Sequence, residues 1–401
     1  MGLHPDVKKY LKTRFPNSVN SKIPSEMCEN QICDLMWLLF KYRPEESSTG
    51  SDLVDFFWRP IEQFFIGGGN AYVCVFDTPQ HVPVAKSEEH KRRYGGGSAE
   101  PLESDACDEQ SLPHPWHAAL ACRTTRAKIV SFITAGISQR FVLHTRRFKG
   151  RSLIISGANA HVRLIDDEGE RVMDEHTAVA DVGEGDLAVA YWAQHFNEAA
   201  TVVRVLDSDQ IPILQLRAHL ANRKHPLYVW LVTPKRPEDL EYHGYTPMPF
   251  EDHTLVNVLG LNDEVRASGL RVEEFCFQVI CQKTDFVDKV ISNLGVQPSL
   301  AALEKNASGA IRVTASAAKC DPEAVKKSFR SAALHSKRKR AEIRTDGDVE
   351  LRRAWWTLCY WAYAWRGKLP DPLTPRKAFG FDEKGFRTTG EGEPYPVLKF
   401  K

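Results

Sequence analysis

Short apolar runs are the main pattern in the first two thirds of the chain, and they predict the strands of a buried sheet. Asn70–Phe76 is rich in β-branched and aromatic residues and follows three glycines, which is typical of a buried parallel strand. Three similar runs are Ser152–Ser156, Thr201–Leu206 and Leu227–Val232. A helical segment from Leu187 to about Phe196 separates the first two of them. The alternation predicts an α/β fold of three layers, with helices flanking a parallel sheet.

The pattern nearer the N-terminus allows two interpretations. Residues 1–66 have a mainly helical pattern, but the apolar run Ile32–Phe40 would be buried as either a strand or a helix. One charged residue, Asp34, interrupts that run. Because an unpaired carboxylate is costly to bury, Asp34 is a candidate functional residue.

Helical patterns replace the strand-like runs beyond about Leu261. Five apolar residues spaced as one helix face are Val272, Phe275, Cys276, Val279 and Ile280. A tryptophan-rich helix is predicted from Asp348 to Arg366, ended by Gly367 and Pro370. We therefore expect a core at residues 1–290, which includes a basic helix and mobile loop at 78–115. A helical region at 291–370 and a tail at 371–401 are expected to follow.

Composition narrows the class of protein. Hydrophobic residues make up 42% and charged residues 26%, which is typical of a globular chain and excludes a fibrous repeat. The nine cysteines form no Cys-x-x-Cys pair, so we expect reduced thiols and no zinc site. There is no N-terminal apolar signal region and no run of about 18 apolar residues that would cross a bilayer. We expect an intracellular monomer, in the nucleus or the cytoplasm, without a membrane partner.

The charge pattern allows nucleic-acid binding only through local patches, because the formal net charge is +1. Lys86, His90 and Arg93 fall on one face of a predicted helix, and Lys91 and Arg92 lie beside them. The second basic cluster is Lys337, Arg338, Lys339 and Arg340. Either cluster is typical of a phosphate-contacting patch or of an ordinary solvated surface, and the second also of a nuclear import signal.

Seven acidic residues are candidates for one site, and four of them stand where strands end or a helix begins. Asp77 and Asp207 each follow a predicted strand directly, and the carboxyl ends of neighbouring parallel strands meet at one crevice. Glu184 and Asp186 open a predicted helix, where acidic side chains are favoured by the positive end of the helix dipole. The complete set is Asp34, Asp77, Glu184, Asp186, Asp207, Asp209 and Asp285.

A cluster of carboxylates at one point requires cations, because each negative charge opposes ionisation of its neighbours. Mg²⁺ and Mn²⁺ take oxygen ligands, and two such ions about 4 Å apart suit phosphodiester hydrolysis. Taken singly, each acid also has a simpler interpretation. Asp77 or Asp207 would be a turn or cap residue, and Glu184 with Asp186 a helix cap. Asp207-Ser-Asp209 alone would equally fit a metal pair of the glycosyltransferase or phosphatase type.

In order and context, these acids resemble those of the flap endonuclease superfamily, which is related to the PIN-like nucleases. The resemblance covers about residues 25–290 and rests on short motifs: Ile32-Cys-Asp-Leu, Tyr72-Val-Cys-Val-Phe-Asp77, Lys86-Ser-Glu-Glu-His-Lys-Arg-Arg93, Glu184-Gly-Asp-Leu-Ala, Val205-Leu-Asp-Ser-Asp209 and Leu259-Gly-Leu-Asn262 with Phe275–Asp285. Glu184-Gly-Asp186 has an aspartate where the family usually has a second glutamate. After Asp285 the chain departs from the family, since Phe286–Gly295 lacks its glycine-rich helix-hairpin-helix.

The resemblance implies a PIN-like core and a two-metal nuclease acting on flaps or 5′ ends of DNA. Asp34, Asp77, Glu184 and Asp186 would hold one ion, and Asp207, Asp209 and Asp285 would help to hold the second. Lys86 and Arg93 match the family's two basic residues over the scissile phosphate. Two alternatives stay open: an mRNA-degrading ribonuclease of the viral host-shutoff type, and a non-catalytic scaffold that binds RNA or protein. We expect the partner to be a nucleic acid, either DNA or RNA.

Overall fold

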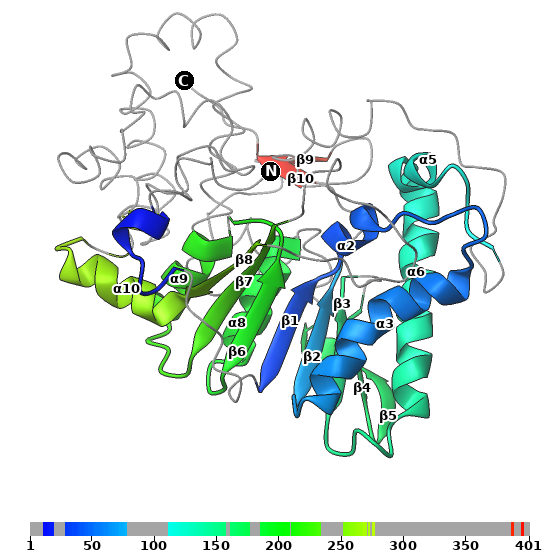
Figure 1. Ribbon diagram of the computed structural model, residues 1–401, viewed down its shortest axis with the longest axis horizontal. Coiled ribbons are helices and arrows are strands. Elements are labelled where there is room, and N and C mark those ends of the chain that lie inside the picture. Colours follow the sequence, from blue (N-terminus) through cyan, green and yellow to red (C-terminus); the bar gives the residue numbers. More distant parts are fainter. Residues whose placement is uncertain are drawn as a thin grey trace, which may run out of the picture.

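The computed structural model describes residues 11–19, 29–77, 111–157, 161–176, 185–208, 210–233, 252–270, 272, 275–276, 386–388 and 394–396. Its centre is an eight-stranded mixed sheet in the order β5-β4-β3-β2-β1-β6-β7-β8, flanked by helices (Figure 1). The predicted α/β class is confirmed. The sheet is not entirely parallel, however, because antiparallel strands extend it at both ends.

The five central strands are parallel and match the five apolar runs of the sequence. They are β1 (Asn30–Asp34), β2 (Ala71–Val75), β3 (Ser152–Ser156), β6 (Thr201–Val205) and β7 (Leu227–Thr233). Every residue of β2 is buried, as expected for a strand covered on both faces. The ambiguous run Ile32–Phe40 is both strand and helix, because β1 ends at Asp34 and α2 (Met36–Lys41) begins two residues later.

The edge strands were not predicted because they carry polar residues. On one side β4 (Arg163–Asp166) and β5 (Gly169–Val172) form a hairpin that is antiparallel to β3. On the other side β8 (Asp252–Asn257) is antiparallel to β7. Charged side chains pair across the hairpin, with Arg163 to Glu170 at 2.8 Å and Arg171 to Asp166 at 2.7 Å.

One face of the sheet packs against α3 (Gly50–Ile66) and α6 (Arg123–Leu143). The core there is mainly aromatic and aliphatic, and Tyr72 and Cys74 of β2 are buried in it. Thr49 begins α3 with a reciprocal capping box, in which Thr49 and Asp52 each accept the other's backbone N–H. The sequence patterns did not predict α6, nor the short α5 (Trp116–Ala121) before it.

The opposite face is covered by α8 (Gly185–His195). Side chains alternate along β2, so Val75 points away from the face that holds Tyr72 and Cys74. An added Cβ on Gly185 would lie 3.7 Å from Val75 Cγ1, which places the start of α8 on this second face. The helices α9 (Gln210–Leu220) and α10 (Val258–Ala267) follow β6 and β8. Both figures show α3 and α6 toward one end of the sheet, and α8, α9 and α10 toward the other.

Several predicted segments lie outside the described residues, namely the basic helix and loop at 78–110, most of the chain after 276 and its tryptophan-rich helix. In the expected tail, β9 (Phe386–Thr388) pairs antiparallel with β10 (Pro394–Pro396). None of the described helices combines the length and the apolar character that crossing a membrane requires.

Candidate functional site: an acidic edge of the sheet

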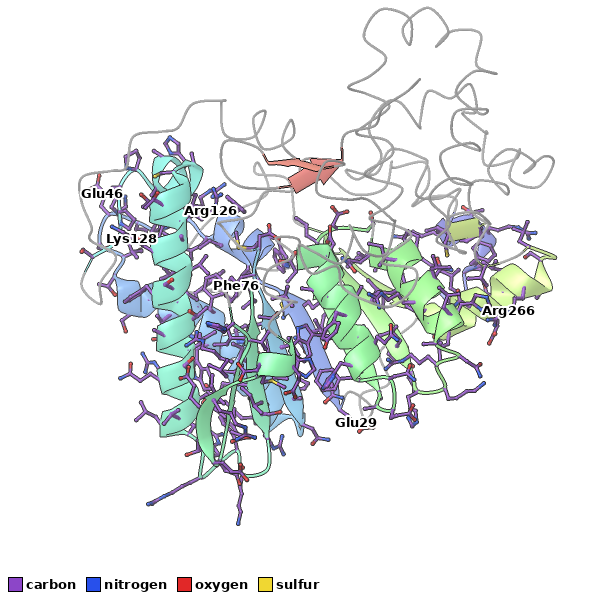
Figure 2. All side chains as sticks on the ribbon, turned by 180° about the vertical axis from the view of Figure 1, so that it is seen from behind. Glu29, Glu46, Phe76, Arg126, Lys128 and Arg266 are labelled. Atoms are coloured by element: carbon purple, nitrogen blue, oxygen red, sulfur yellow. The ribbon has the colours of Figure 1, made fainter. Side chains whose placement is uncertain are left out.

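Three of the predicted acids lie where neighbouring parallel strands end. Asp34 is the last residue of β1, Asp77 lies two residues after β2, and Asp207 lies two residues after β6. The strand order β2-β1-β6 places these three ends side by side (Figure 1). Figure 2 marks the two edges, with Glu29 just before β1 at one end of the strands and Phe76 just after β2 at the other.

The strand order also reverses at this edge. From β1 the chain proceeds to β2 and β3 in one direction, whereas β6 and β7 extend the sheet in the other. A reversal of this kind opens a crevice outside the carboxyl ends of the strands, which is where open α/β sheets bind ligands. Asp34 and Asp207 stand on the two sides of that reversal, and both are half-buried.

Asp77 holds the start of α8. Its Oδ1 accepts a hydrogen bond from the backbone N–H of Gly185 at 2.8 Å. This N–H has no acceptor within the helix because it belongs to the first turn. Glycine suits this place, since an added Cβ would come within 2.8 Å of the same Oδ1. The carboxylate after β2 and the beginning of α8 are therefore brought into direct contact.

Asp34 is held by the turn that follows its own strand. Its Oδ1 accepts from the backbone N–H of Met36 at 2.9 Å. In register, Asp34 pairs with Val75 on the neighbouring parallel strand. Residues in register on parallel strands point to the same face, so Asp34 emerges on the face that α8 covers.

Asp186 brings a fourth carboxylate to this edge from the first turn of α8. It is only 7% exposed, and its Oδ1 accepts a hydrogen bond from Gln210 Nε2 at 2.8 Å. Gln210 is the first residue of α9, which follows Asp207 and Ser208. We use the term acidic edge for Asp34, Asp77, Asp186 and Asp207.

The other predicted site residues lie outside the described part of the chain: Glu184, Asp209, Asp285, Lys86, Lys91, Arg92, Arg93, Lys337, Arg338, Lys339 and Arg340. Within the part that is described, no three acidic, histidine or cysteine side chains come close enough to hold a metal ion together. The structure thus places four acids at one edge of the sheet, and it draws Asp77 to the helix that carries Asp186. It does not gather the described acids into a single cluster.

Two residues of this edge were missed in the sequence, Gly185 and Gln210. Each lies between or beside predicted acids, in Glu184-Gly-Asp186 and in Asp207-Ser-Asp-Gln210. Glycine at a helix start and glutamine in a helix have ordinary explanations, so the only available signal was proximity to the acids. Their roles depend on contacts between segments that are 24 or more residues apart.

A second polar cluster lies at the other end of α8. His176 Nδ1 is hydrogen-bonded to the Tyr191 hydroxyl, and the rings of His176 and His195 are 4.9 Å apart. We call His176, Tyr191 and His195 the imidazole cluster. Burial lowers the pKa of both histidines below its usual value, and the neighbouring His176 lowers that of His195 further. Burial raises the pKa of Tyr191.

The cysteines near the acidic edge are structural. Cys33 and Cys74 are adjacent in register on β1 and β2 and fully buried. Burial raises the pKa of Cys33 to about 11 and also raises that of Cys74. Both are protonated thiols near neutral pH, so neither is suited to bind a metal as a thiolate.

The Gln215 side chain offers an internal comparison on the same helix as Gln210. It is also fully buried, but its Nε2 donates to Asn262 Oδ1 at 3.2 Å. Asn262 Nδ2 returns a hydrogen bond to the main-chain oxygen of Gln215 at 2.9 Å. This amide pair joins α9 to α10, whereas Gln210 joins α9 to a carboxylate of the acidic edge.

The sequence was also compared with known proteins. No protein-family model matches it, and no curated protein matches it.

Proposed function

We propose that the chain is a metal-dependent nuclease of the flap endonuclease type, which hydrolyses phosphodiester bonds in DNA at flaps or 5′ ends. On this proposal residues 1–290 form a PIN-like core. The observation that supports it best is the acidic edge itself. Four carboxylates lie where the strand order reverses, and three of them stand at or just beyond the ends of adjacent parallel strands.

The donor set at this edge suits hard cations by its chemistry, although its described members do not come together as a group that could hold an ion. All four described side chains offer carboxylate oxygens, which Mg²⁺ and Mn²⁺ prefer. Asp34, Asp77 and Asp186 would hold one ion together with Glu184, and Asp207 would hold the second with Asp209 and Asp285. Bound there, such ions lower the pKa of a coordinated water and stabilise a leaving oxygen.

The chain's own residues fix where these oxygens stand. Backbone N–H groups of Gly185 and Met36 orient Asp77 and Asp34, and the amide of Gln210 orients Asp186. A preorganised set of negative oxygens is what a divalent cation requires.

A second candidate is a non-catalytic scaffold with the same fold. The observation that favours it is that Asp34 and Asp77 each accept a hydrogen bond at the start of a helix, as ordinary capping residues do. An mRNA-degrading ribonuclease is the third candidate, and it differs from the first only in its substrate.

Two substitutions at Asp77 separate capping from catalysis. Asp77→Asn keeps an oxygen that can accept the N–H of Gly185 but removes the negative charge. Purified full-length protein is tested on labelled single-stranded RNA, single-stranded DNA and a flap duplex, with Mg²⁺ and with EDTA. The nuclease proposal expects Mg²⁺-dependent cleavage by the wild type, none in EDTA, and loss of cleavage in a folded Asp77→Asn variant.

The outcome discriminates among the three candidates. Cleavage of DNA flaps supports the first, and cleavage of RNA alone supports the ribonuclease. If no substrate is cut, while Asp77→Ala lowers stability and Asp77→Asn does not, the acid is a cap and the scaffold is supported. If Asp77→Asn cleaves at the wild-type rate, the acidic edge is not the active site.

A further inference from the structure

Charged residues are distributed unevenly along the chain. The whole sequence has 53 lysines and arginines against 52 aspartates and glutamates, yet the stretch from Ser111 to Ile165 contains nine of the former and none of the latter. Four of these nine fall within Arg146–Arg151, a segment of six residues between α6 and β3. We call this segment the basic turn. A local excess of positive charge attracts anionic partners even when the net charge of the chain is close to zero.

The basic turn is anchored to the core by its one apolar residue. Phe148 is 2% exposed, and its ring centroid lies 5.2 Å from that of Phe65 and 5.9 Å from that of Phe141. Its backbone N–H donates to the main-chain oxygen of His144, whose ring stacks on Trp58 at 5.9 Å. An ordinary solvated run of charges has no such anchor. The cations of the basic turn therefore lose less freedom when they bind a partner.

Arg151 attaches the basic turn to the end of α3. Its Nη1 donates to the main-chain oxygens of Phe65 at 2.6 Å and Gly69 at 2.5 Å. Figure 1 shows the ends of α3 and α6 toward the edge of the sheet at which the parallel strands begin, opposite the acidic edge. The five residues of β3 follow Arg151 directly. At about 3.3 Å per residue, they separate the basic turn from the other edge by about 17 Å.

Acidic side chains balance only part of the charge in this region. Arg147 pairs with Glu62 at 3.4 Å, and Arg140 of α6 pairs with Asp55 at 2.8 Å. Arg146 and Lys149 are both exposed, and no acid of the described residues forms an ion pair with either of them. Arginine and lysine side chains of this kind are the usual contacts of phosphate oxygens.

The surroundings of the basic turn bear on the class of anion that it suits. Leu143 is 69% exposed and Ile66 is 55% exposed, and a lipid surface would take apolar and basic residues together. These two apolar residues come from the ends of different helices, whereas the basic residues form one continuous segment. Charge is thus the dominant feature of this surface, which favours a polyanion such as a nucleic acid over a lipid bilayer.

We propose that the basic turn binds the phosphate backbone of a nucleic acid, with Arg146 and Lys149 as its two contacts. The choice of a nucleic acid rests on the proposed function. Contacts to phosphates carry no sequence information, so binding here is independent of base sequence. Because the basic turn and the acidic edge lie at opposite ends of the strands, removing these two cations should weaken binding and leave the turnover rate unchanged.

The test compares two double variants of the full chain that have the same net charge. Arg146→Gln with Lys149→Gln removes the two proposed contacts. Lys224→Gln with Arg266→Gln removes two other exposed cations, beyond the ends of α9 and α10. Affinity for a labelled DNA duplex and for labelled single-stranded RNA is measured in EDTA by fluorescence anisotropy at several KCl concentrations.

The expected result is a change in the salt dependence of binding. For the duplex, the slope of log affinity against log salt should become shallower by about 2 in the first double variant, which corresponds to two lost phosphate contacts. The second double variant should keep the wild-type slope. Equal slopes in the two double variants overturn the inference, and so does a wild type that binds neither nucleic acid.

A further variant and a further ligand sharpen the outcome. Arg146→Lys with Lys149→Arg exchanges the two cations and should bind like the wild type, whereas a loss as large as that of the glutamine variant overturns a role for charge. Vesicles of phosphatidylserine and phosphatidylcholine test the lipid surface. Binding of the wild type to these vesicles and not to nucleic acid overturns the inference in favour of a membrane.

Cleavage assays in Mg²⁺ separate this inference from the proposed function. If the wild type binds nucleic acid with the expected change of slope but cuts nothing, the nuclease proposal fails and the inference stands. If the wild type cuts, the variant Arg146→Gln with Lys149→Gln should raise KM and leave kcat unchanged. If KM then stays at the wild-type value, the inference fails while the proposed function stands.

Discussion

The two ends of α8 differ in their side chains, which are acidic at its beginning and include two histidines at its end. At its beginning, Asp77 and Asp186 place carboxylates near the positive end of the helix dipole. At its end, the imidazole cluster places two histidines near the negative end, where a positive charge would be favoured. Burial nevertheless lowers the pKa of both histidines, so they are neutral near pH 7.

The difference shows which end is suited to a ligand. The imidazole cluster is neutral, and it is held together by the hydrogen bond between His176 and Tyr191 and by the packing of His176 on His195 and Trp192. The beginning of α8 gathers anionic oxygens that neutral amide and N–H donors orient. We therefore expect changes at the end of α8 to affect stability, and changes at its beginning to affect activity.

The largest expected effect is at the end of α8. Trp192 is fully buried and packs against His176, His195 and Phe196. Trp192→Ala should lower the free energy of unfolding by about 3 to 5 kcal/mol, measured by urea denaturation. Trp192→Phe is the control and should cost clearly less. A change of less than about 1 kcal/mol for Trp192→Ala would show that this end of the helix is not a packed core.

Next in size is the loss of activity at the acidic edge. On the nuclease proposal, Asp207→Asn should reduce cleavage by more than about 100-fold, because it removes a carboxylate that would hold the second metal ion. Its thermal unfolding should be unchanged or shifted to higher temperature, since the acids repel one another when no cation is bound. Asp263→Asn, on an exposed aspartate of α10, is the matched control and should cut normally. Equal activity in the two variants would remove Asp207 from the site.

A smaller effect is expected where Asp77 meets α8. Asp77→Ala leaves the N–H of Gly185 without its acceptor and should cost about 1 kcal/mol of stability. Asp77→Asn keeps an acceptor and should cost little. Thermal unfolding of both variants in EDTA makes this comparison without any contribution from metal. If both lose the same stability, the charge of Asp77, and not its hydrogen bond, holds α8.

The smallest effect is a dependence of stability on pH. In the unfolded chain the histidines have their ordinary pKa of 6.5, and burial lowers the folded values of His176 and His195 below it. As the pH falls through 6.5 the unfolded chain binds protons first, so this contribution to stability is present above 6.5 and is lost on acidification. Glu175 opposes the shift of both histidines, and the pKa of Tyr191 is raised away from this range.

Urea denaturation at several pH values between about 7.5 and 5 measures how steeply the free energy of unfolding depends on pH. The variant His195→Gln should flatten it, because one of the two neutral imidazoles is removed. If the slope is the same in His195→Gln as in the wild type, other groups cause the loss of stability in acid. A stability that rises on acidification would contradict the lowered pKa values.

The central strands could be predicted from the sequence because a buried parallel strand is a continuous run of apolar residues. Asn70–Phe76 and Leu227–Val232 carry almost no polar residue, so their burial and type followed directly. The β4–β5 hairpin could not be predicted in this way, since Arg163-Leu-Ile-Asp166 and Gly169-Glu-Arg-Val172 are short and charged. The parallel sheet was correct for the centre and wrong for both edges.

The acidic edge could be predicted in part for the same reason. Asp77 and Asp207 were placed by the strands that they follow, and the structure puts those strands in one sheet, on either side of β1. The contact between Gln210 and Asp186 could not be foreseen, because it depends on how two helices meet above the sheet. The roles of Asp34, Asp77, Asp186 and Asp207 in metal binding stay predictions, as do those of the acids outside the described residues.

The charged hairpin also has a consequence for self-association. Among the described residues, β5 is the last strand on its side of the sheet, and an outermost strand offers unpaired backbone groups to another chain. Here that strand is only four residues long, and its Glu170 and Arg171 are held by Arg163 and Asp166 of β4. A second molecule that added a strand would have to strip water from these ion pairs. The charges therefore protect this border of the sheet against polymerisation, far from the strand ends where the acids lie.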